Sequence, residues 1–537
     1  MSVLENSRST TGTNTRYKDV SPTSGMCPIC EKDCPILCEI GKSSFRGREV
    51  LYPKEESFGK STAGANKDYG LTFGDLQIMV ALQGAEGIEP DSDKAILPNA
   101  DISSEAGGVP IKVPVIIAGL GSTAVAHSNW DGLAIGAAIS GTIMTVGENV
   151  CGMDPKSRYE NGLVKYSEDL KYRVETYRKY WDGVYGDIVV QTNVEDQRGG
   201  VDLYAIQELG VNTIERKWGQ GAKAIGGEVR IFDLDKALLL KSRGYVVLPD
   251  PEDPAVQAAF REGMFESFER HSRVGMPEEM PFIEDIAWLR KQGAKRVFLK
   301  TGAYNPAAVA FTLRVASEAK VDFLTFDGAG GGTGMSPVPM MHECSTSTLY
   351  LAAQVLKGAQ ILKSKGKYVP GMAIAGGIID ETQIFKAIAM SNFGEGPFFK
   401  AVAMARSPIT AVMKADYFAR LAEADDLPHK FADLYGRKPE QFFISYYELR
   451  EKYGDAVGKE IPWSAVGLYT YFTNRIGTGL RQLMAGNRKF KLDLLSRNDL
   501  ASLSERCERV TGIPTIDKKD AELFEAILDY ESDAVVG

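Results

Sequence analysis

Between residues 110 and 410 the chain alternates short runs of apolar, often β-branched residues with longer amphipathic stretches. The short runs have the length of buried strands and end in glycine or polar residues, whereas the longer stretches have helical spacing. This alternation predicts repeated strand–helix units and a parallel sheet. The runs predicted as strands are Val113–Ala118, Thr142–Val146, Ile188–Gln191, Asn212–Glu215, Arg296–Lys300, Asp322–Phe326, Met372–Ala375 and Phe398–Val402.

Eight such units predict an α/β fold, a (β/α)8 TIM barrel over residues 110–410. A further apolar run, Tyr245–Leu248, precedes the proline-rich, acidic stretch 249–281, and we assign it to an insertion. Helical periodicity beyond residue 410 predicts a helical C-terminal cap over 411–537. Its clearest stretches are Phe431–Tyr435, Phe442–Tyr453 and Leu468–Met484.

The first hundred residues lack this regular alternation. Residues 1–20 are rich in Ser, Thr and Asn, which is typical of a flexible tail. A cysteine-rich segment over 21–45 follows, and residues 46–109 are expected to form an N-terminal cap. Within that cap, Leu76–Gln83 is predicted to be helical.

Composition excludes several classes of protein. The 537 residues are 44% hydrophobic and 25% charged, values typical of a globular protein with a sizeable core. The net charge of −9 and the lack of basic runs argue against nucleic-acid binding. No apolar run reaches the roughly 18 residues of a membrane span, and no signal peptide is evident. We therefore expect a cytoplasmic protein.

Four of the seven cysteines, Cys27, Cys30, Cys34 and Cys38, form a C-x2-C-x3-C-x3-C cluster. Four thiolates this close together suit an iron–sulphur cluster better than zinc, whose sites usually separate two cysteine pairs by a longer stretch. We favour 4Fe-4S over 3Fe-4S, with zinc or no metal as alternatives.

Loops that could contact a ligand follow the last three predicted strands, and those after the sixth and seventh strands contain clustered glycines. The sixth is followed by Phe326–Pro337 with five glycines, the seventh by Gly376–Gly377 and a helix starting near Asp380, and the eighth ends at Lys400–Val402. In such barrels the last two loops and a helix N-terminus commonly bind phosphate. These loops predict a phosphorylated cofactor, with tight turns as the alternative. No Gly-x-Gly-x-x-Gly follows a first strand, which disfavours a nicotinamide fold.

Three stretches together resemble the synthase domain of glutamate synthases and its stand-alone archaeal-type relatives. They are Gly219–Lys223 with Gly226–Gly227, Gly331–Pro337, and Gly141–Thr142 with Gly147–Glu148. The resemblance implies bound FMN. The residues predicted to contact it are Ser122, Gln191, Lys300, Gly331, Gly332, Gly376, Gly377, Ala401 and Val402.

Two strand-end residues have specific expected roles. Gln191 could hydrogen-bond the flavin pyrimidine edge, and Lys300 could stabilise negative charge on the reduced ring. The alternatives are a surface polar residue for Gln191 and a lysine extending to solvent for Lys300.

The substrate is expected to meet Lys217, Gln220 and Lys223, whose cations suit a dicarboxylate. Glu148 is the candidate for proton exchange with an amino or imino substrate, alongside Lys300 as a catalytic residue. A solvated charge pair and an exposed loop glutamate are the respective alternatives. His342 is a weaker candidate near the glycine loop.

The sequence departs from the glutamate synthase pattern in three places. The segment Ala403–Met413 contains no cysteine where the family carries its cluster loop, Gly330 replaces an acidic residue, and the chain begins Met1-Ser2 without a nucleophilic cysteine. We therefore expect ammonia to arrive free or from a partner glutaminase subunit.

The predicted function is reductive amination of 2-oxoglutarate to glutamate through 2-iminoglutarate. Electrons would come from ferredoxin or an NAD(P)H-oxidising subunit, and an oligomer is expected. The alternatives are a flavin barrel acting on a different amino or oxo acid, and an electron-transfer subunit of a larger complex.

Overall fold

The computed structural model describes residues 44–45, 69–221, 227–331, 340 and 343–529. The predicted flexible tail and several predicted site residues lie outside the described residues. Those site residues are Cys27, Cys30, Cys34, Cys38, Lys223, Gly332 and His342.

Eight parallel strands close into a barrel. In chain order they are β4 (Val115–Leu120), β5 (Ile143–Val146), β8 (Ile188–Thr192), β9 (Thr213–Lys217), β13 (Arg296–Thr301), β14 (Phe323–Asp327), β15 (Gly371–Ala375) and β16 (Phe399–Met404). The ring is completed where β16 pairs with β4, Val402 lying opposite Val115. All eight predicted strands and the (β/α)8 class are confirmed.

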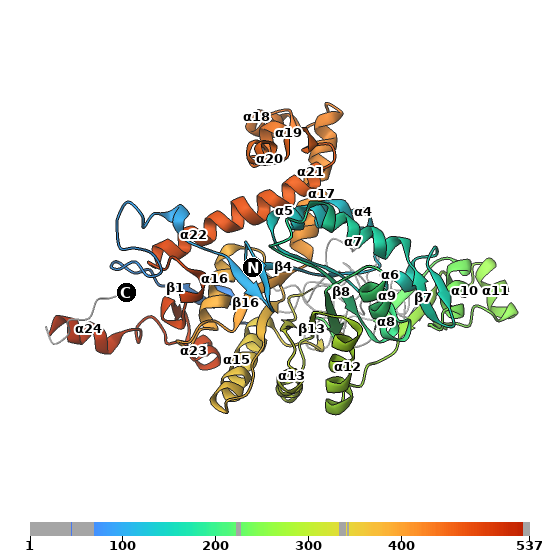
Figure 1. Ribbon diagram of the computed structural model, residues 1–537, viewed down its shortest axis with the longest axis horizontal. Coiled ribbons are helices and arrows are strands. Elements are labelled where there is room, and N and C mark those ends of the chain that lie inside the picture. Colours follow the sequence, from blue (N-terminus) through green and yellow to red (C-terminus); the bar gives the residue numbers. More distant parts are fainter. Residues whose placement is uncertain (1–43, 46–68, 222–226, 332–339, 341–342, 530–537) are drawn as a thin grey trace, which may run out of the picture.

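Alternate residues of each strand face opposite sides of the barrel wall, as the period of two requires. Outward residues such as Ile214 and Leu299 join the main core under the helices, whereas inward residues such as Val189 and Phe298 form a separate interior cluster. The helices wrap the outside of the barrel (Figure 1). The longer ones are α5 (Trp130–Ser140), α7 (Glu168–Tyr180), α12 (Glu279–Gln292), α13 (Pro306–Glu318), α15 (Thr348–Ser364), α16 (Glu381–Met390) and α17 (Arg406–Glu423).

A hairpin of β2 (Ser104–Ala106) and β3 (Val109–Ile111) plugs the N-terminal end of the barrel. Ala106, Val109 and Ile111 belong to the interior cluster. At the hairpin turn Gly107 has φ +57°, and a Cβ there would lie 2.7 Å from the Phe298 ring. With this end filled, the opposite end, where the strands terminate, is the place for chemistry.

The predicted helix at Leu76–Gln83 is wrong. Residues Leu76–Ile78 form strand β1, antiparallel to β17 (Leu500–Ser502). A capping box at Thr72 starts a single 3-10 turn that ends at Asp75. The helical prediction failed because β1 acquires its hydrogen-bonding partner from the far end of the chain, and no local pattern reveals that pairing.

The insertion predicted around Tyr245–Leu248 is confirmed. Strands β10 (Gly227–Ile231), β12 (Phe268–Ser272) and β11 (Val246–Leu248) form an antiparallel sheet in that order, between β9 and β13 in the chain. Helices α10 (Leu234–Ser242) and α11 (Pro254–Arg261) accompany it, at one end of the molecule (Figure 1).

The predicted C-terminal helices are also confirmed. Helices α18 (His429–Tyr435), α19 (Pro439–Phe442) and α20 (Tyr446–Tyr453) project from the body of the molecule (Figure 1). Helix α21 (Trp463–Tyr469) continues through a π-helical stretch, Thr470–Ile476, into α22 (Gly477–Gly486), and α23 (Glu505–Thr511) and α24 (Ala521–Leu528) follow.

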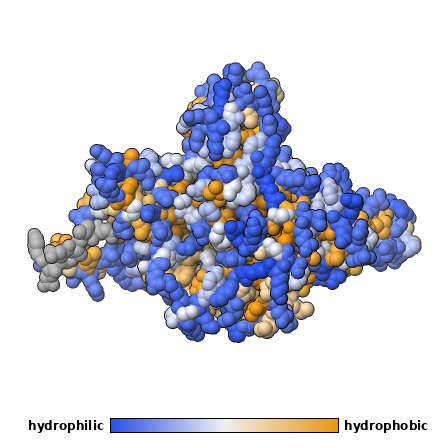
Figure 2. Space-filling model, viewed as in Figure 1, coloured by the Kyte–Doolittle hydropathy of each residue, from blue (hydrophilic) through white to orange (hydrophobic). Residues whose placement is uncertain are grey.

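The face shown in Figure 2 is mostly hydrophilic, with hydrophobic residues in scattered groups. Within the described part of the chain, no helix has both the length and the apolar character needed to cross a bilayer.

Candidate functional site at the barrel mouth

Four neighbouring strands place charged and polar side chains inside the barrel near their C-terminal ends. These are Gln191 on β8, Glu215 and Lys217 on β9, Lys300 on β13 and Asp327 on β14. The period-two alternation that buries apolar residues lower in the barrel brings these side chains to the same inner face. All five are buried or nearly so. Buried charges require partners, and each one here has a counterion or hydrogen bond.

Lys300 is only 5% exposed, so the alternative of a lysine extending to solvent is excluded. Its Nζ lies 3.4 Å from Oδ2 of Asp327. Burial raises the pKa of Glu215, while the positive charge of Lys300 and a hydrogen bond from Gln191 act in the opposite direction. The barrel mouth thus holds a fixed cation beside a carboxyl group that retains its proton more readily than usual.

Gln191 is 1% exposed, which excludes the surface alternative. Its Nε2 donates to Oε1 of Glu215, and its own Oε1 accepts no hydrogen bond from the described residues. A Cβ on Gly119 of β4 would lie 2.6 Å from that oxygen. The glycine therefore leaves room for a buried acceptor that is available to a ligand donor.

Lys217 at the end of β9 and Glu148 in the turn after β5 form an ion pair at the mouth. Nζ of Lys217 lies 2.6 Å from Oε1 of Glu148 and 2.6 Å from Oε1 of Gln220. Burial alone would raise the pKa of Glu148, but the charge and hydrogen bond of Lys217 outweigh it and hold the pKa at about 2. A group ionised at all ordinary pH values is a poor proton donor, so the geometry favours Glu148 as the partner that orients Lys217.

The turn that carries Glu148 is held by backbone contacts on both sides. A Cβ on Gly121 would lie 2.4 Å from the carbonyl oxygen of Glu148. On the other side, both carboxylate oxygens of Asp196 accept from the backbone N–H of Asn149, at 3.1 and 3.0 Å. Burial raises the pKa of Asp196 to about 7, and the nearby Glu148 charge adds to the rise.

The glycine-rich loops after β14 and β15 pack directly against one another. A Cβ on Gly330 would lie 2.8 Å from the carbonyl oxygen of Gly376. Thr348 Oγ1 donates to the same carbonyl at 2.8 Å. Gly376 and Gly377 have φ of +117° and +77°, the left-handed region that favours glycine. Loop packing therefore requires these glycines whether or not a ligand also approaches them.

The helix predicted to begin near Asp380 is confirmed as α16, but its first turn is already capped. Asp380 accepts from the N–H groups of Thr382 and Gln383, both at 3.0 Å. A phosphate at this N-terminus would meet that carboxylate. Helix α17 instead begins at Arg406 without a side-chain cap, so the N–H groups of its first turn are better placed to bind a phosphate.

The remaining predicted cofactor residues are spread around the mouth. Ser122 is partly exposed in the loop after β4, and Gly331 lies after β14 against Asp327. Ala401 faces the barrel interior. Val402 faces outward into the helical core, and its N–H donates to the carbonyl of Pro114 at 3.0 Å.

Arg270 is a candidate that the sequence interpretation missed. It lies on β12 of the insertion, is 3% exposed and stacks over the Tyr245 ring at 5.1 Å. Its Nη2 contacts Ser272 Oγ at 3.3 Å, while Nε and Nη1 have no partner among the described side chains and backbone groups. Its charge acts on Asp196, which places it near the Glu148 turn. A buried guanidinium with open donors is suited to a carboxylate ligand.

No group of three or more His, Cys, Asp or Glu side chains in the described residues is arranged to hold a metal ion. Cys151 and Cys507 are buried and Cys344 is exposed, each as a free thiol. The cluster at Cys27–Cys38 lies outside the described residues and stays a prediction.

No family model matches the chain, and no curated protein is detectably similar to it in sequence. Its overall structure is similar to a lactate oxidase of Pediococcus acidilactici (13% identity, TM-score 0.46, covering 86% of this chain and 94% of that one). It is also similar to flavocytochrome b2 with sulfite bound (12% identity, TM-score 0.45, covering 90% of each chain). A third similar structure is an (S)-mandelate dehydrogenase (15% identity, TM-score 0.44, covering 82% of this chain and 93% of that one). Identity and structural overlap this low do not indicate the reaction, and the barrel is established by its own strand pairings.

Proposed function

We propose that the protein is an FMN-dependent oxidoreductase that reduces the Cα of an imine formed from a small 2-oxo acid and ammonia. The observation that carries the proposal is the buried pair of Lys300 and Gln191, a fixed cation and an open amide oxygen, on the inner face of a (β/α)8 barrel. The described residues fit the flavin, whose pyrimidine edge offers an N–H for Gln191 Oε1 and develops negative charge near a cation on reduction.

The chain would hold the flavin from two sides. Gln191 and Lys300 would meet its ring, while the loop at Gly376–Gly377 and the first turn of α17 with Arg406 would meet its phosphate. FMN supplies hydride transfer when it is bound. The residues of the chain fix position and charge around the reacting carbon.

The substrate side of the mouth has two cations suited to a dicarboxylate such as 2-oxoglutarate. Lys217 is oriented by Glu148 and Gln220, and Arg270 has open donors beside the Glu148 turn. Because its pKa is raised by burial, Glu215 is the better source of a proton for a developing amine. Glutamate is the expected product.

The cysteine cluster at Cys27, Cys30, Cys34 and Cys38 completes the proposal as the route by which electrons enter. Ferredoxin or an NAD(P)H-oxidising subunit would be the donor, and ammonia would be free or come from a glutaminase partner. Spectra of anaerobically purified protein would count flavin and cluster separately. Flavin without a metal–sulphur signal would remove the cluster from the proposal and leave the barrel part intact.

The deciding experiment uses the full chain loaded with FMN and reduced anaerobically with dithionite. It is mixed with 2-oxoglutarate and isotope-labelled ammonium, and labelled glutamate is measured by mass spectrometry. Pyruvate with ammonium tests a different oxo acid, and lactate or mandelate with oxidised protein tests the alternative of hydroxy-acid oxidation. Failure to bind FMN would contradict the whole proposal, whereas flavin binding without glutamate formation would contradict only the substrate.

A further inference from the structure

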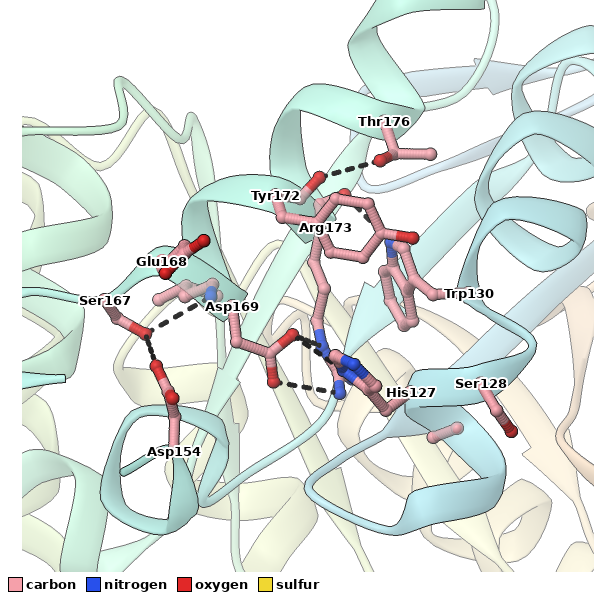
Figure 3. A network of polar contacts seen from close by, with 12 residues as sticks. His127, Ser128, Trp130, Asp154, Ser167, Glu168, Asp169, Tyr172, Arg173 and Thr176 are labelled. Carbon is pink, nitrogen blue, oxygen red and sulfur yellow. Dashed lines mark hydrogen bonds and ion pairs between the residues drawn. The ribbon is translucent and has the colours of Figure 1, made fainter. Parts of the chain in front are cut away.

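Arg173 on α7 is a fully buried arginine that donates hydrogen bonds to the end of β4 and to the loop that follows it. Its Nη1 donates to the carbonyl oxygens of Gly121 at 3.0 Å and Leu120 at 3.3 Å. Nε and Nη2 bind the two oxygens of Asp169 at 2.9 and 3.3 Å. The guanidinium lies 4.7 Å from the Trp130 ring, whose Nε1 donates to the carbonyl of Arg173 at 3.1 Å (Figure 3).

This network uses the planar geometry of the guanidinium. Two nitrogens face one carboxylate while a third reaches backbone carbonyls, and one face stacks on the indole ring. A lysine ammonium has the charge but cannot present this fixed fork. His127 contacts the same Asp169 at 3.2 Å from the exposed side, so the carboxylate is held between the two residues (Figure 3).

The anchored loop is in direct contact with the turn that carries Glu148. The Leu120 carbonyl bonded to Arg173 also accepts from the N–H of Gly147 at 2.9 Å. A Cβ on Gly147 would lie 2.5 Å from the backbone nitrogen of Gly121. Because these backbones touch without an intervening side chain, a displaced Gly121 must displace the Glu148 turn.

The turn itself is in a conformation that needs outside support. Asn149, directly after Glu148, has φ +65°, in the left-handed region that residues with a side chain adopt less readily than glycine. Asp196 fixes the N–H of this residue from one side. The loop held by Arg173 provides the support on the other side.

We propose that Arg173 is a positioning residue that acts through the Leu120–Gly121 loop to hold the Glu148 turn, and with it the Lys217 ammonium, in place at the barrel mouth. The link to substrate binding rests on the proposed function, because that function assigns Lys217 to the substrate. The link to the turn rests on geometry alone.

The first test measures backbone hydrogen exchange over residues 143–153 in the full-length protein without substrate. R173K should raise exchange at Gly147 and Asn149 by about tenfold or more, the effect of losing one charge-assisted hydrogen bond. The matched control is R178K on the same helix. Arg178 also donates to two backbone carbonyls, of Leu209 at 2.5 Å and Gly210 at 2.7 Å, but in the turn that leads into β9 at the far end of the barrel.

R178K should leave exchange at residues 143–153 unchanged. If R173K fails to fold, D169N provides a second variant, because it keeps Arg173 but removes the charge that orients it. An unchanged 143–153 segment in folded R173K or D169N, or equal increases in R173K and R178K, would overturn the proposal.

The second test is a double-mutant cycle on 2-oxoglutarate binding, measured by calorimetry on the FMN-loaded protein. R173K should weaken binding about tenfold in the wild-type background and have little effect in the E148Q background, because it acts through Glu148. Fully additive effects would overturn the coupling. If the wild type binds no 2-oxoglutarate, the proposed substrate is wrong, and the exchange experiment still decides the role of Arg173.

Discussion

The two halves of the barrel mouth use the same strand geometry for opposite purposes. Strands β8, β9, β13 and β14 end with polar inward residues, Gln191, Lys217, Lys300 and Asp327. Strands β15, β16 and β4 carry small inward residues near their ends, Ala375, Ala403 and Gly119, and β5 is followed by Gly147. Because the backbone is continuous around the ring, side-chain choice alone creates this asymmetry.

Under the proposed function, this difference lets one closed barrel both accommodate and orient a ligand. Small side chains allow a flat ring to approach the wall, while the polar half supplies directional contacts and charge. Neither half would suffice by itself. A barrel mouth lined only by alanine could hold a ligand but would not fix its orientation. A mouth lined only by charged residues would leave no space for the ligand or would leave some of the charges unpaired.

The largest effect is expected from Lys300→Met, which removes the cation from the polar half while keeping the approximate volume. Without the positive charge the reduced flavin is less stabilised, so turnover per bound flavin should fall by about 100-fold or more. Flavin content should be measured spectroscopically and turnover by glutamate formation from 2-oxoglutarate and ammonium.

The matched control for this change is Lys295→Met. Lys295 is exposed just before the start of β13, at the opposite end of the barrel from Lys300. It should leave flavin content and turnover at the wild-type level. Normal turnover in Lys300→Met would show that the polar half does not act on the flavin.

Ala403→Leu changes the small-residue half. Ala403 is 3% exposed and faces inward near the end of β16. Three added carbons should obstruct the approach of a ring and weaken FMN binding by roughly tenfold to 100-fold, since overpacking costs about 1 to 3 kcal/mol. FMN affinity by fluorescence titration provides the measurement. Circular dichroism shows whether the barrel is retained, and a retained barrel with unchanged affinity would place the flavin elsewhere.

The fold could be predicted because strand and helix periods recur locally along the chain. Most barrel strands, for example Ile188–Thr192, contain an apolar run that can be recognised without knowing the distant partner strand. The strand Leu76–Ile78 shows the limit. It is defined by pairing with residues 500–502, and its own few residues carry no period long enough to separate strand from helix.

The candidate site was only partly predictable for the same reason. Gln191 and Lys300 end apolar runs, so their position in the strand identified them, whereas Lys217 was predicted in the loop after the fourth strand and is the last residue of β9. Arg270 did not stand out, because its strand is short and lies within the proline-rich, acidic stretch 249–281. Arg173 is part of an ordinary charged helix, and only the folded chain shows that its guanidinium reaches Leu120 and Gly121.

Arg270→Lys tests the residue that the sequence concealed. A lysine keeps the charge but loses the open pair of donors on Nε and Nη1, so a carboxylate should bind about tenfold more weakly. The KM for 2-oxoglutarate should rise while kcat changes little, because the lost contact serves binding in both ground and transition states. An unchanged KM would show that Arg270 does not contact the substrate, and only the polar residues on the barrel strands would remain as candidates for substrate binding.

The smallest effect is expected in the pH dependence of stability after Glu148→Gln. The pKa of Glu148 is about 2 in the folded protein, below its ordinary value of 4.5, so the folded state favours the ionised form. This stabilisation is present above about pH 5 and is lost as the pH falls towards 2.

E148Q should therefore be less stable than the wild type at neutral pH by about 1 kcal/mol, the scale of one hydrogen-bond partner. It should also lose less stability than the wild type between about pH 5 and pH 3. Urea unfolding at a series of pH values measures both quantities, with Glu175→Gln at an exposed position of α7 as the control. Parallel pH curves for E148Q and the wild type would show that the Lys217–Glu148 pair does not stabilise the folded barrel mouth.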